Sequence, residues 1–301
     1  MRRQIEFTSE GMLCRGRLYV PDGLKPGTKA PAVVTANAIT AIQEMIVPDY
    51  AERLAAAGFV TLIFDYAHWG ASEGEPRNHF VAYTQQQNIR DAVVWLANQP
   101  EVDPERIGGV GVSMGASHML FLAPFERRLK AVVSIAAYIN AIAVWEPMLG
   151  REGLQGFLAQ VSYERQQRQA TGERAVYVPA VGHYGETAAI PQEEAYNFYM
   201  EAQRTVAPAY ENRMTLQSVP NMVEYNPDFA VHLAAPTALL MVHAQQDMIP
   251  VDLVREVFSR VREPKNMAVL DCRHTDLLAG DLWLSQAAGM AVEWFKTYLS
   301  S

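Results

Sequence analysis

The sequence predicts an α/β protein whose mostly parallel, doubly wound sheet carries an N-terminal antiparallel ribbon and a helical cap insertion. First, short apolar runs alternate with helical patterns along most of the chain, as in parallel strands covered by helices on both faces. Second, a period-two pattern near the N-terminus indicates a half-exposed ribbon. Third, the alternation stops over residues 140–230. We therefore expect a core formed by residues 1–139 and 231–301, with a cap at 140–230.

The N-terminal ribbon is expected from residue alternation. From Met12 to Val20, small or apolar residues alternate with a set that contains Arg15 and Arg17, which is the period of a strand with one exposed face. Residues 5–7 are expected to pair with this strand in an antiparallel ribbon, through a turn at 9–11.

Buried strands and helices then alternate along the chain. Continuous apolar runs predict strands that are buried on both faces, at 32–36, 60–64, 106–112, 131–135, 237–242 and 267–270. Helical patterns separate or follow them, at 44–57, 81–98, 251–261 and 281–298, and directly after Ser113. Residues 140–230 carry short helical patterns without a clear buried strand, so we interpret them as an insertion packed over the edge of the sheet.

Composition limits the class of protein. The 301 residues are half hydrophobic and carry a net charge of −8 with both signs interspersed, which argues against a nucleic-acid partner. The basic N-terminus lacks the apolar segment of a signal peptide, and no apolar run approaches membrane-spanning length. Cys14 and Cys272 lie far apart and lack metal or redox spacing. We expect a soluble cytoplasmic protein, and the sequence does not indicate its oligomeric state.

The motif Gly-x-Ser-x-Gly at residues 111–115 is the strongest chemical signal. It stands between the apolar run 107–112 and the small-residue segment 116–122, which is the strand–turn–helix context that gives the motif its meaning. The sharp turn strains the backbone at Ser113 and holds its hydroxyl at the carboxyl edge of the sheet. A helix N-terminus nearby favours a developing oxyanion. We therefore predict that Ser113 is a nucleophile.

A serine nucleophile requires a base and a group that orients the base. In this topology the acid and then the histidine should follow the serine, in loops after later strands. Asp247 and His274 meet both conditions, although Asp247 alone also suits a helix cap. Asp228 is the first alternative acid and Asp271 the second. Asp228 lies in a turn-like Asn-Pro-Asp stretch, and Asp271 lies close to the strand end.

The remaining histidines are expected to be mainly structural. His118 lies in the helix after Ser113, and His243 ends the strand before the acid loop. His68 lies on a loop that reaches toward the predicted site, so we count it as a candidate substrate contact. The other histidines are His79, His183 and His232. They show no metal-ligand spacing, so no metal is expected.

The oxyanion requires two N–H donors. One is expected to be the backbone N–H of Met114, directly after the nucleophile. The other should come from the loop after 32–36, from Ala38 or Ile39, and residue type does not choose between backbone donors.

Several segments together resemble the alpha/beta-hydrolase superfamily. Beyond residues 111–115, these segments are 64–66 and 70–77 after one buried strand, then 91–93 and 102–108 before the serine motif. They are most similar to a dienelactone-hydrolase-like branch that includes fungal polyketide transferases. The resemblance spans nearly the whole chain apart from residues 140–230. It implies the alpha/beta-hydrolase fold, with Ser113, Asp247 and His274 as the triad.

The oxyanion loop departs from the family pattern. Family members usually carry a glycine-rich loop, whereas residues 35–40 read Thr-Ala-Asn-Ala-Ile-Thr. Side chains there narrow the backbone angles that the loop can adopt. Asn37 is a candidate substrate contact through its side-chain amide.

These observations predict a serine hydrolase that cleaves a carboxylic ester or thioester through an acyl-serine. Acyl transfer by the same triad is the nearest alternative, and a non-catalytic ligand-binding protein on this fold is the alternative from another class. No cofactor is expected, because the serine motif lacks phosphate-loop spacing. An aromatic-rich cap with few basic clusters favours a small-molecule substrate with an apolar or aromatic acyl group. Most of the cap's large side chains are nevertheless expected to form the cap's own core. These large side chains are Trp145, Met148, Phe157, Tyr163, Tyr177, Tyr184, Tyr196, Phe198 and Tyr199.

Overall fold

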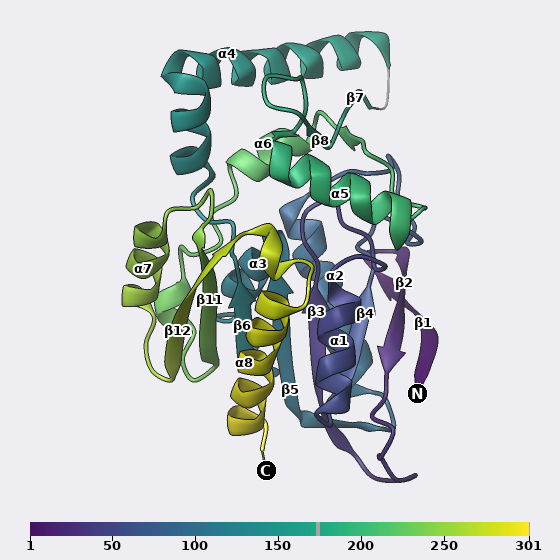
Figure 1. Ribbon diagram of the computed structural model, residues 1–301. Coiled ribbons are helices and arrows are strands. Elements are labelled where there is room, and N and C mark those ends of the chain that lie inside the picture. Colours follow the sequence, from purple (N-terminus) through teal and green to yellow (C-terminus); the bar gives the residue numbers. More distant parts are fainter. Residues whose placement is uncertain (173–174, 301) are drawn as a thin grey trace.

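The computed structural model describes residues 1–172 and 175–300, and an eight-stranded sheet forms its centre (Figure 1). The strand order is β1-β2-β4-β3-β5-β6-β11-β12. The six strands from β4 to β12 in this order run parallel, whereas β2 is antiparallel to both of its neighbours. These strands are β1 Arg2–Ser9, β2 Met12–Tyr19, β3 Ala30–Ala36, β4 Val60–Phe64, β5 Val102–Val112, β6 Leu129–Ile135, β11 Ala238–Gln246 and β12 Lys265–Arg273.

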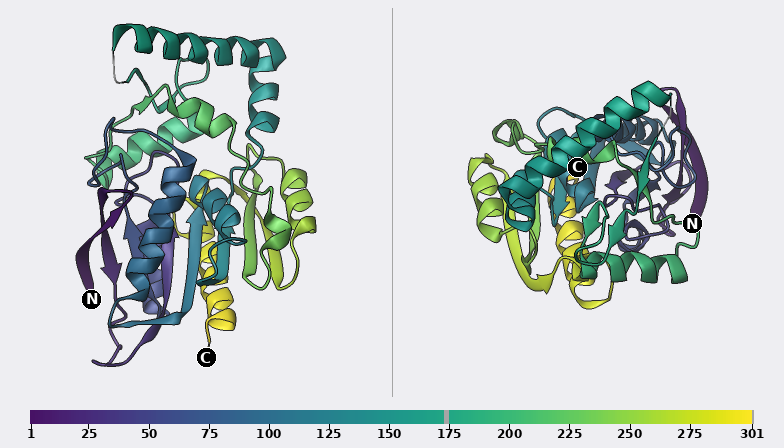
Figure 2. Two further views of the ribbon diagram at one scale, coloured as in Figure 1. Left: turned by 180° about the vertical axis from the view of Figure 1, so that it is seen from behind. Right: turned by 90° about the horizontal axis from the view of Figure 1, so that it is seen from above.

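Helices cover both faces of the sheet. Helices α1 and α8 pack against one face, where they form one apolar cluster with the strands. Helices α2, α3 and α7 contribute to a second cluster on the opposite face (Figures 1 and 2). Their bounds are α1 Val47–Ala56, α2 Ala82–Ala97, α3 Met114–Leu122, α7 Val251–Arg260 and α8 Leu282–Tyr298. No helix among the described residues is long and apolar enough to cross a membrane.

The predicted fold class is therefore confirmed, including the N-terminal ribbon. In β1 every second residue from Ile5 onward is buried, as expected for a strand with one solvent face. The central strands are buried along nearly their whole length, which explains their continuous apolar sequences.

The observed bounds differ from the predicted ones at element ends. Helix α1 begins at Val47 rather than residue 44, with Pro48 in its first turn, where a proline loses no helical hydrogen bond. Strands β11 and β12 extend past their apolar segments as far as Gln246 and Arg273, which pair with each other. This extension matters for the site, because Asp247 directly follows β11 and His274 directly follows β12.

We call residues 140–230 the insert, and most of its described part lies above the carboxyl ends of the strands (Figure 1). The insert combines three helices with four strands of two residues each among its described residues, so it is less purely helical than predicted. Its longest helix bends at Gly150, where φ is 68° and ψ is 161°. The standing of the insert as a separate domain stays a prediction. Its elements are α4 Ala141–Thr171, β7 Tyr177–Val178, β8 Val181–Gly182, β9 Ile190–Pro191, α5 Glu193–Thr205, β10 Met214–Thr215 and α6 Ser218–Val223. Two short 3-10 turns complete the fold, η1 Val231–Leu233 and η2 Thr275–Leu277.

Candidate active site

Ser113 lies in a sharp turn between β5 and α3. Its φ of 55° and ψ of −119° belong to a region that residues with a side chain rarely adopt. A Cβ on Gly111 would lie 2.1 Å from the carbonyl oxygen of Gly115, and a Cβ on Gly115 would lie 2.0 Å from that of Ala36. Only glycine therefore fits on either side of this turn. The Ser113 N–H donates to the carbonyl oxygen of Ile135 at 2.9 Å, which ties the turn to β6.

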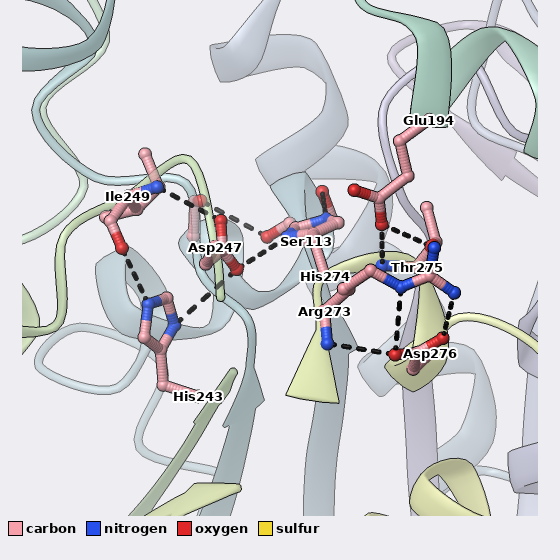
Figure 3. Close-up of polar contacts among 10 residues, drawn as sticks. Ser113, Glu194, His243, Asp247, Ile249, Arg273, His274, Thr275 and Asp276 are labelled. Carbon is pink, nitrogen blue, oxygen red and sulfur yellow. Dashed lines mark hydrogen bonds and ion pairs between the residues drawn. The ribbon is translucent and has the colours of Figure 1, made fainter. Parts of the chain in front are cut away.

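The structure brings Ser113, His274 and Asp247 into one hydrogen-bonded chain (Figure 3). His274 Nε2 lies 3.2 Å from Ser113 Oγ, and His274 Nδ1 lies 2.7 Å from Asp247 Oδ2. The other Asp247 oxygen accepts the N–H of Ile249 at 3.0 Å. These are the distances that a nucleophile, a base and an orienting acid require.

The two alternative acids are engaged elsewhere. Asp228 forms an ion pair with Arg260 of α7, and Asp271 accepts a hydrogen bond from the Gln246 amide at 3.3 Å. Neither aspartate contacts His274, so the geometry favours Asp247 as the partner of the ring.

Asp247 and His274 stabilise each other's charged forms. Burial disfavours the protonated ring, but the charge and hydrogen bond of Asp247 outweigh burial, and the pKa of His274 is raised above 6.5. Burial also works against the Asp247 carboxylate, yet the charge and hydrogen bond of His274 prevail and lower the pKa of this carboxyl below its ordinary value. Asp247 is thus ionised at neutral pH and can stabilise an imidazolium at His274.

His243 is a buried neighbour of Asp247. Its Nε2 must carry the proton, because its partner at 2.9 Å is the carbonyl oxygen of Ile249, which only accepts. Its Nδ1 lies 3.9 Å from Asp247 Oδ2 and makes no hydrogen bond among the described residues. Burial lowers the pKa of this ring, so His243 is neutral. It contacts the turn that carries Asp247, in keeping with the structural role expected from the sequence.

The candidate oxyanion donors differ in availability. The Ala38 N–H donates to Asn37 Oδ1 at 2.9 Å, and Ala38 does not reach the cavity above Ser113. Ile39 and Met114 both line that cavity. Within residues 1–172 and 175–300 no hydrogen bond is found for the N–H groups of Ile39 and Met114. Of the two predicted loop donors, the geometry therefore favours Ile39.

Asn37 and His68 do not lie where a substrate contact requires them. Asn37 is buried, and its amide donates to the carbonyl oxygens of Ile42 and Met45 at 2.9 and 3.3 Å. It therefore fixes the loop and does not face the cavity. The His68 ring contacts the carbonyl oxygen of Pro76 at 3.0 Å and does not line the cavity either. The sequence placed both residues on the correct loops but could not show that local hydrogen bonds occupy their side chains.

The other histidines lie outside the chain of Ser113, His274 and Asp247. His118 is buried between Gln85 and Tyr225, whereas His232 is exposed. The remaining two have polar partners in or beside the insert, Thr215 for His79 and Glu193 for His183. No group of three or more metal-binding side chains is assembled by the residues that the structure describes.

A cavity of about 620 Å³ opens above Ser113 and His274 between the core and the insert. Its walls are largely apolar, and neither lysine nor arginine is found among its described lining residues. Five of the aromatic residues noted in the sequence line it: Trp145, Phe157, Tyr184, Phe198 and Tyr199. Three do not, namely Tyr163, Tyr177 and Tyr196, and the Met148 side chain lies outside the described part of the chain. More of the aromatic side chains therefore face the cavity than expected.

Two residues near His274 were not found by sequence reasoning. Glu194 of the insert and Thr275 both line the cavity. Glu194 accepts hydrogen bonds from the Thr275 N–H, at 3.1 Å, and from its hydroxyl. The two residues are separated by 81 positions, and no local sequence pattern links them.

Comparisons with known proteins identify the family of this chain. The family model of X-Pro dipeptidyl-peptidase (S15 family) matches residues 10–284. The polyketide transferase grgF of Penicillium sp. is 28% identical over 286 residues, which cover 93% of this chain and 92% of the relative. The thiohydrolase aneE of Aspergillus aculeatus is also 28% identical, over 92% of this chain and 87% of the relative.

Solved structures show the same fold over the full length of the chain. The crystal structure of the alpha/beta hydrolase GrgF from Penicillium sp. sh18 superimposes with a TM-score of 0.84 at 26% identity, covering 99% of both chains. The structure of DcsB in complex with its substrate analogue gives the same TM-score and identity, covering both chains completely. The family match, the relatives and the fold lead to one conclusion. The chain belongs to the X-Pro dipeptidyl-peptidase (S15) family of alpha/beta hydrolases, on the branch that includes the polyketide transferases and thiohydrolases.

Proposed function

We propose that this protein is a serine enzyme that cleaves a carboxylic ester or thioester through an acyl-serine intermediate on Ser113. The observation that carries the proposal is the hydrogen-bonded chain Ser113–His274–Asp247 at a strained turn that opens into an apolar cavity. The names of the relatives, thiohydrolase and polyketide transferase, support a thioester as the acyl donor.

Acylation begins when Ser113 Oγ attacks the carbonyl carbon of the substrate. His274 Nε2 takes the hydroxyl proton, and Asp247 stabilises the resulting imidazolium. The N–H groups of Met114 and Ile39 donate to the oxyanion of the tetrahedral intermediate. When the intermediate collapses, the bond to the leaving group breaks. The departing thiolate or alkoxide takes the proton from His274 and leaves as a thiol or alcohol.

Deacylation repeats these steps with water. His274 removes a proton from a water molecule, whose oxygen attacks the acyl carbon. The Ser113–acyl bond then breaks, and Ser113 Oγ recovers its proton from His274 while the carboxylic acid leaves. The same two residues therefore serve both half-reactions.

The cavity supports an apolar or aromatic acyl group. The rings of Trp145 and Phe157 of α4 pack at a tilt of 40° with centroids 5.5 Å apart, and they line the cavity together with Phe198 of α5. A phosphorylated substrate would require cations near its phosphates, and the described lining supplies neither lysine nor arginine. We therefore place the acyl chain against these rings.

Acyl transfer is the second candidate, because several relatives are named polyketide transferases. Transfer shares the acyl-serine and differs only in the group that attacks it. An alcohol or amine would replace water, and His274 would remove its proton in the same way.

The test measures thioester cleavage by the purified enzyme, and the release of free thiol is the readout. We would use N-acetylcysteamine thioesters of acetate, octanoate and a phenylpropanoate, with wild type, S113A and H274A. The proposal predicts turnover by wild type and a loss of about 10³-fold or more in both variants. Folded S113A that retains full turnover would contradict it. Added alcohols and amines then distinguish the two candidates, because transfer yields new esters or amides at the expense of the free acid.

A further inference from the structure

The His274 segment is fixed on both sides by carboxylates. On one side the Arg273 N–H donates to Asp276 at 2.9 Å, and on the other the Thr275 N–H donates to Glu194 at 3.1 Å. Asp276 belongs to the same loop, whereas Glu194 comes from the first turn of α5 in the insert. Figure 3 shows Glu194 reaching down onto Thr275 beside the catalytic candidates.

We propose that Glu194 is a positioning residue for His274, so that the insert supplies part of the catalytic arrangement as well as the walls of the cavity. This inference rests on the proposed function. Its basis is the double contact to Thr275, in which one carboxylate oxygen accepts both the backbone N–H and the side-chain hydroxyl. Charge-assisted bonds of this kind fix the backbone of the residue that follows His274.

The contact also places a second negative charge near the ring. Asp247 faces His274 from the end of β11, and Glu194 faces it from α5; both raise the pKa of His274 against the opposing effect of burial. His243 on β11 is neutral, and Arg273 and Asp276 form a partly exposed ion pair of their own. Glu194 is therefore the charged neighbour of His274 that the insert contributes.

A positioning role predicts an effect that does not depend on the substrate. A residue that only shapes the cavity affects substrates that reach it, so its loss should spare a small acyl group. Glu194 acts on His274 itself, and its loss should slow the smallest thioester as much as a long one. The acetyl thioester therefore separates positioning from substrate selection.

The experiment compares E194Q and E194A with wild type in pH profiles of kcat/KM and in kcat for acetyl and octanoyl thioesters. E194Q keeps an oxygen for Thr275 but loses the charge, so the acid limb should move to lower pH, and kcat at the plateau should fall less than in E194A. E194A also loses the acceptor, and kcat should fall about tenfold for both thioesters. E201Q is the matched control, because Glu201 is an exposed carboxylate of the same helix that pairs with Arg204. It should behave as wild type.

Three outcomes would overturn the proposal. In the first, E194Q has an unchanged acid limb and folded E194A an unchanged kcat for the acetyl thioester. In the second, the loss in E194A is confined to the octanoyl thioester, which would assign Glu194 to substrate selection. In the third, E201Q shifts as much as E194Q, which would indicate a general charge effect of α5. If E194A does not fold, an unchanged acid limb in E194Q alone overturns the proposal. Activity retained by S113A would instead contradict the proposed function, so the two failures are distinguishable.

Discussion

At the scale of single residues, the site depends on two glycines, Gly111 and Gly115, that leave room for the sharp turn at Ser113. The backbone of Ser113 is strained, and the surrounding strand and helix hold it because residues 111 and 115 have no side chain. The strain lifts the hydroxyl out of the sheet toward His274, as in other sites where unfavourable backbone angles accompany function.

Replacing Gly115 by alanine tests this packing. The new Cβ would meet the carbonyl oxygens of Ala36 and Asn37, so the turn or the oxyanion loop must move. We expect a loss of about 1–3 kcal/mol in the free energy of unfolding, measured by denaturant titration. The control is G156A on the exposed part of α4, where a Cβ meets nothing within 4 Å and alanine should be neutral or stabilising by up to about 1 kcal/mol. Equal stability of the two variants would contradict the packing argument.

The pH dependence of kcat/KM tests the Asp247–His274 pair. The ring must be neutral to accept a proton, so activity should fall as the pH drops through a His274 pKa above 6.5. D247N removes the negative charge that raises this pKa, so the acid limb should move to lower pH. The plateau of kcat should also fall by about 10³- to 10⁴-fold, because the ring loses its orienting partner. An acid limb that stays in place in D247N would contradict the assignment of this acid.

The placement of Ser113, Asp247 and His274 at one edge of the sheet could be predicted from the sequence, because each directly follows a strand. The role of Asn37 could not, because an amide that bonds its own loop and an amide that faces a substrate look alike in sequence. Choosing Ile39 over Ala38 likewise required knowing that the Ala38 N–H is already bonded. Glu194 was missed because its contact with Thr275 exists only in the folded chain.

At the scale of elements, two segments complete the candidate site around Ser113, Asp247 and His274. The loop after β3, which is the predicted oxyanion loop, is held by Asn37, and α4 and α5 of the insert line the cavity. The first segment is short and internally bonded, whereas the second brings aromatic rings from distant positions in the sequence.

Replacing Asn37 by alanine tests the loop. The variant loses the bonds to Ile42 and Met45 and frees the Ala38 N–H, so the Ile39 N–H should no longer be fixed in position. We expect kcat to fall by about 10²-fold with KM nearly unchanged, because oxyanion contacts form in the transition state. Steady-state kinetics with the acetyl thioester measure this. A variant with wild-type kcat and raised KM would instead indicate a substrate contact.

Replacing Phe157 by alanine tests the insert as the acyl-binding wall. The ring packs at a tilt against Trp145 and lines the cavity. Its loss should reduce kcat/KM about tenfold for the octanoyl thioester and hardly at all for the acetyl thioester. Y163A is the control on the same helix, because Tyr163 is 61% exposed and does not line the cavity. Equal losses for both thioesters in F157A would mean that this ring does not bind the acyl chain.

At the scale of the whole molecule, the sheet assembles the site from distant parts of the chain. Ser113 and His274 are 161 positions apart, yet each follows a parallel strand whose carboxyl end lies at the same edge. The alternation of apolar runs and helical patterns was sufficient to predict this arrangement. The break in that alternation led us to expect an insertion at 140–230, whose standing as a separate domain stays a prediction. The short strands of this segment and the bend at Gly150 depend on tertiary packing and were not predicted.

The most direct test of the central claim is labelling by a fluorophosphonate probe, which reacts covalently with activated serines. Wild type and S113A would be labelled side by side, and the modified peptide would be located by mass spectrometry. We predict one modification, on Ser113, that is absent from S113A and greatly slowed in H274A. Folded wild type that takes up no label, or S113A that is labelled as fast as wild type, would contradict the assignment of Ser113 as the nucleophile.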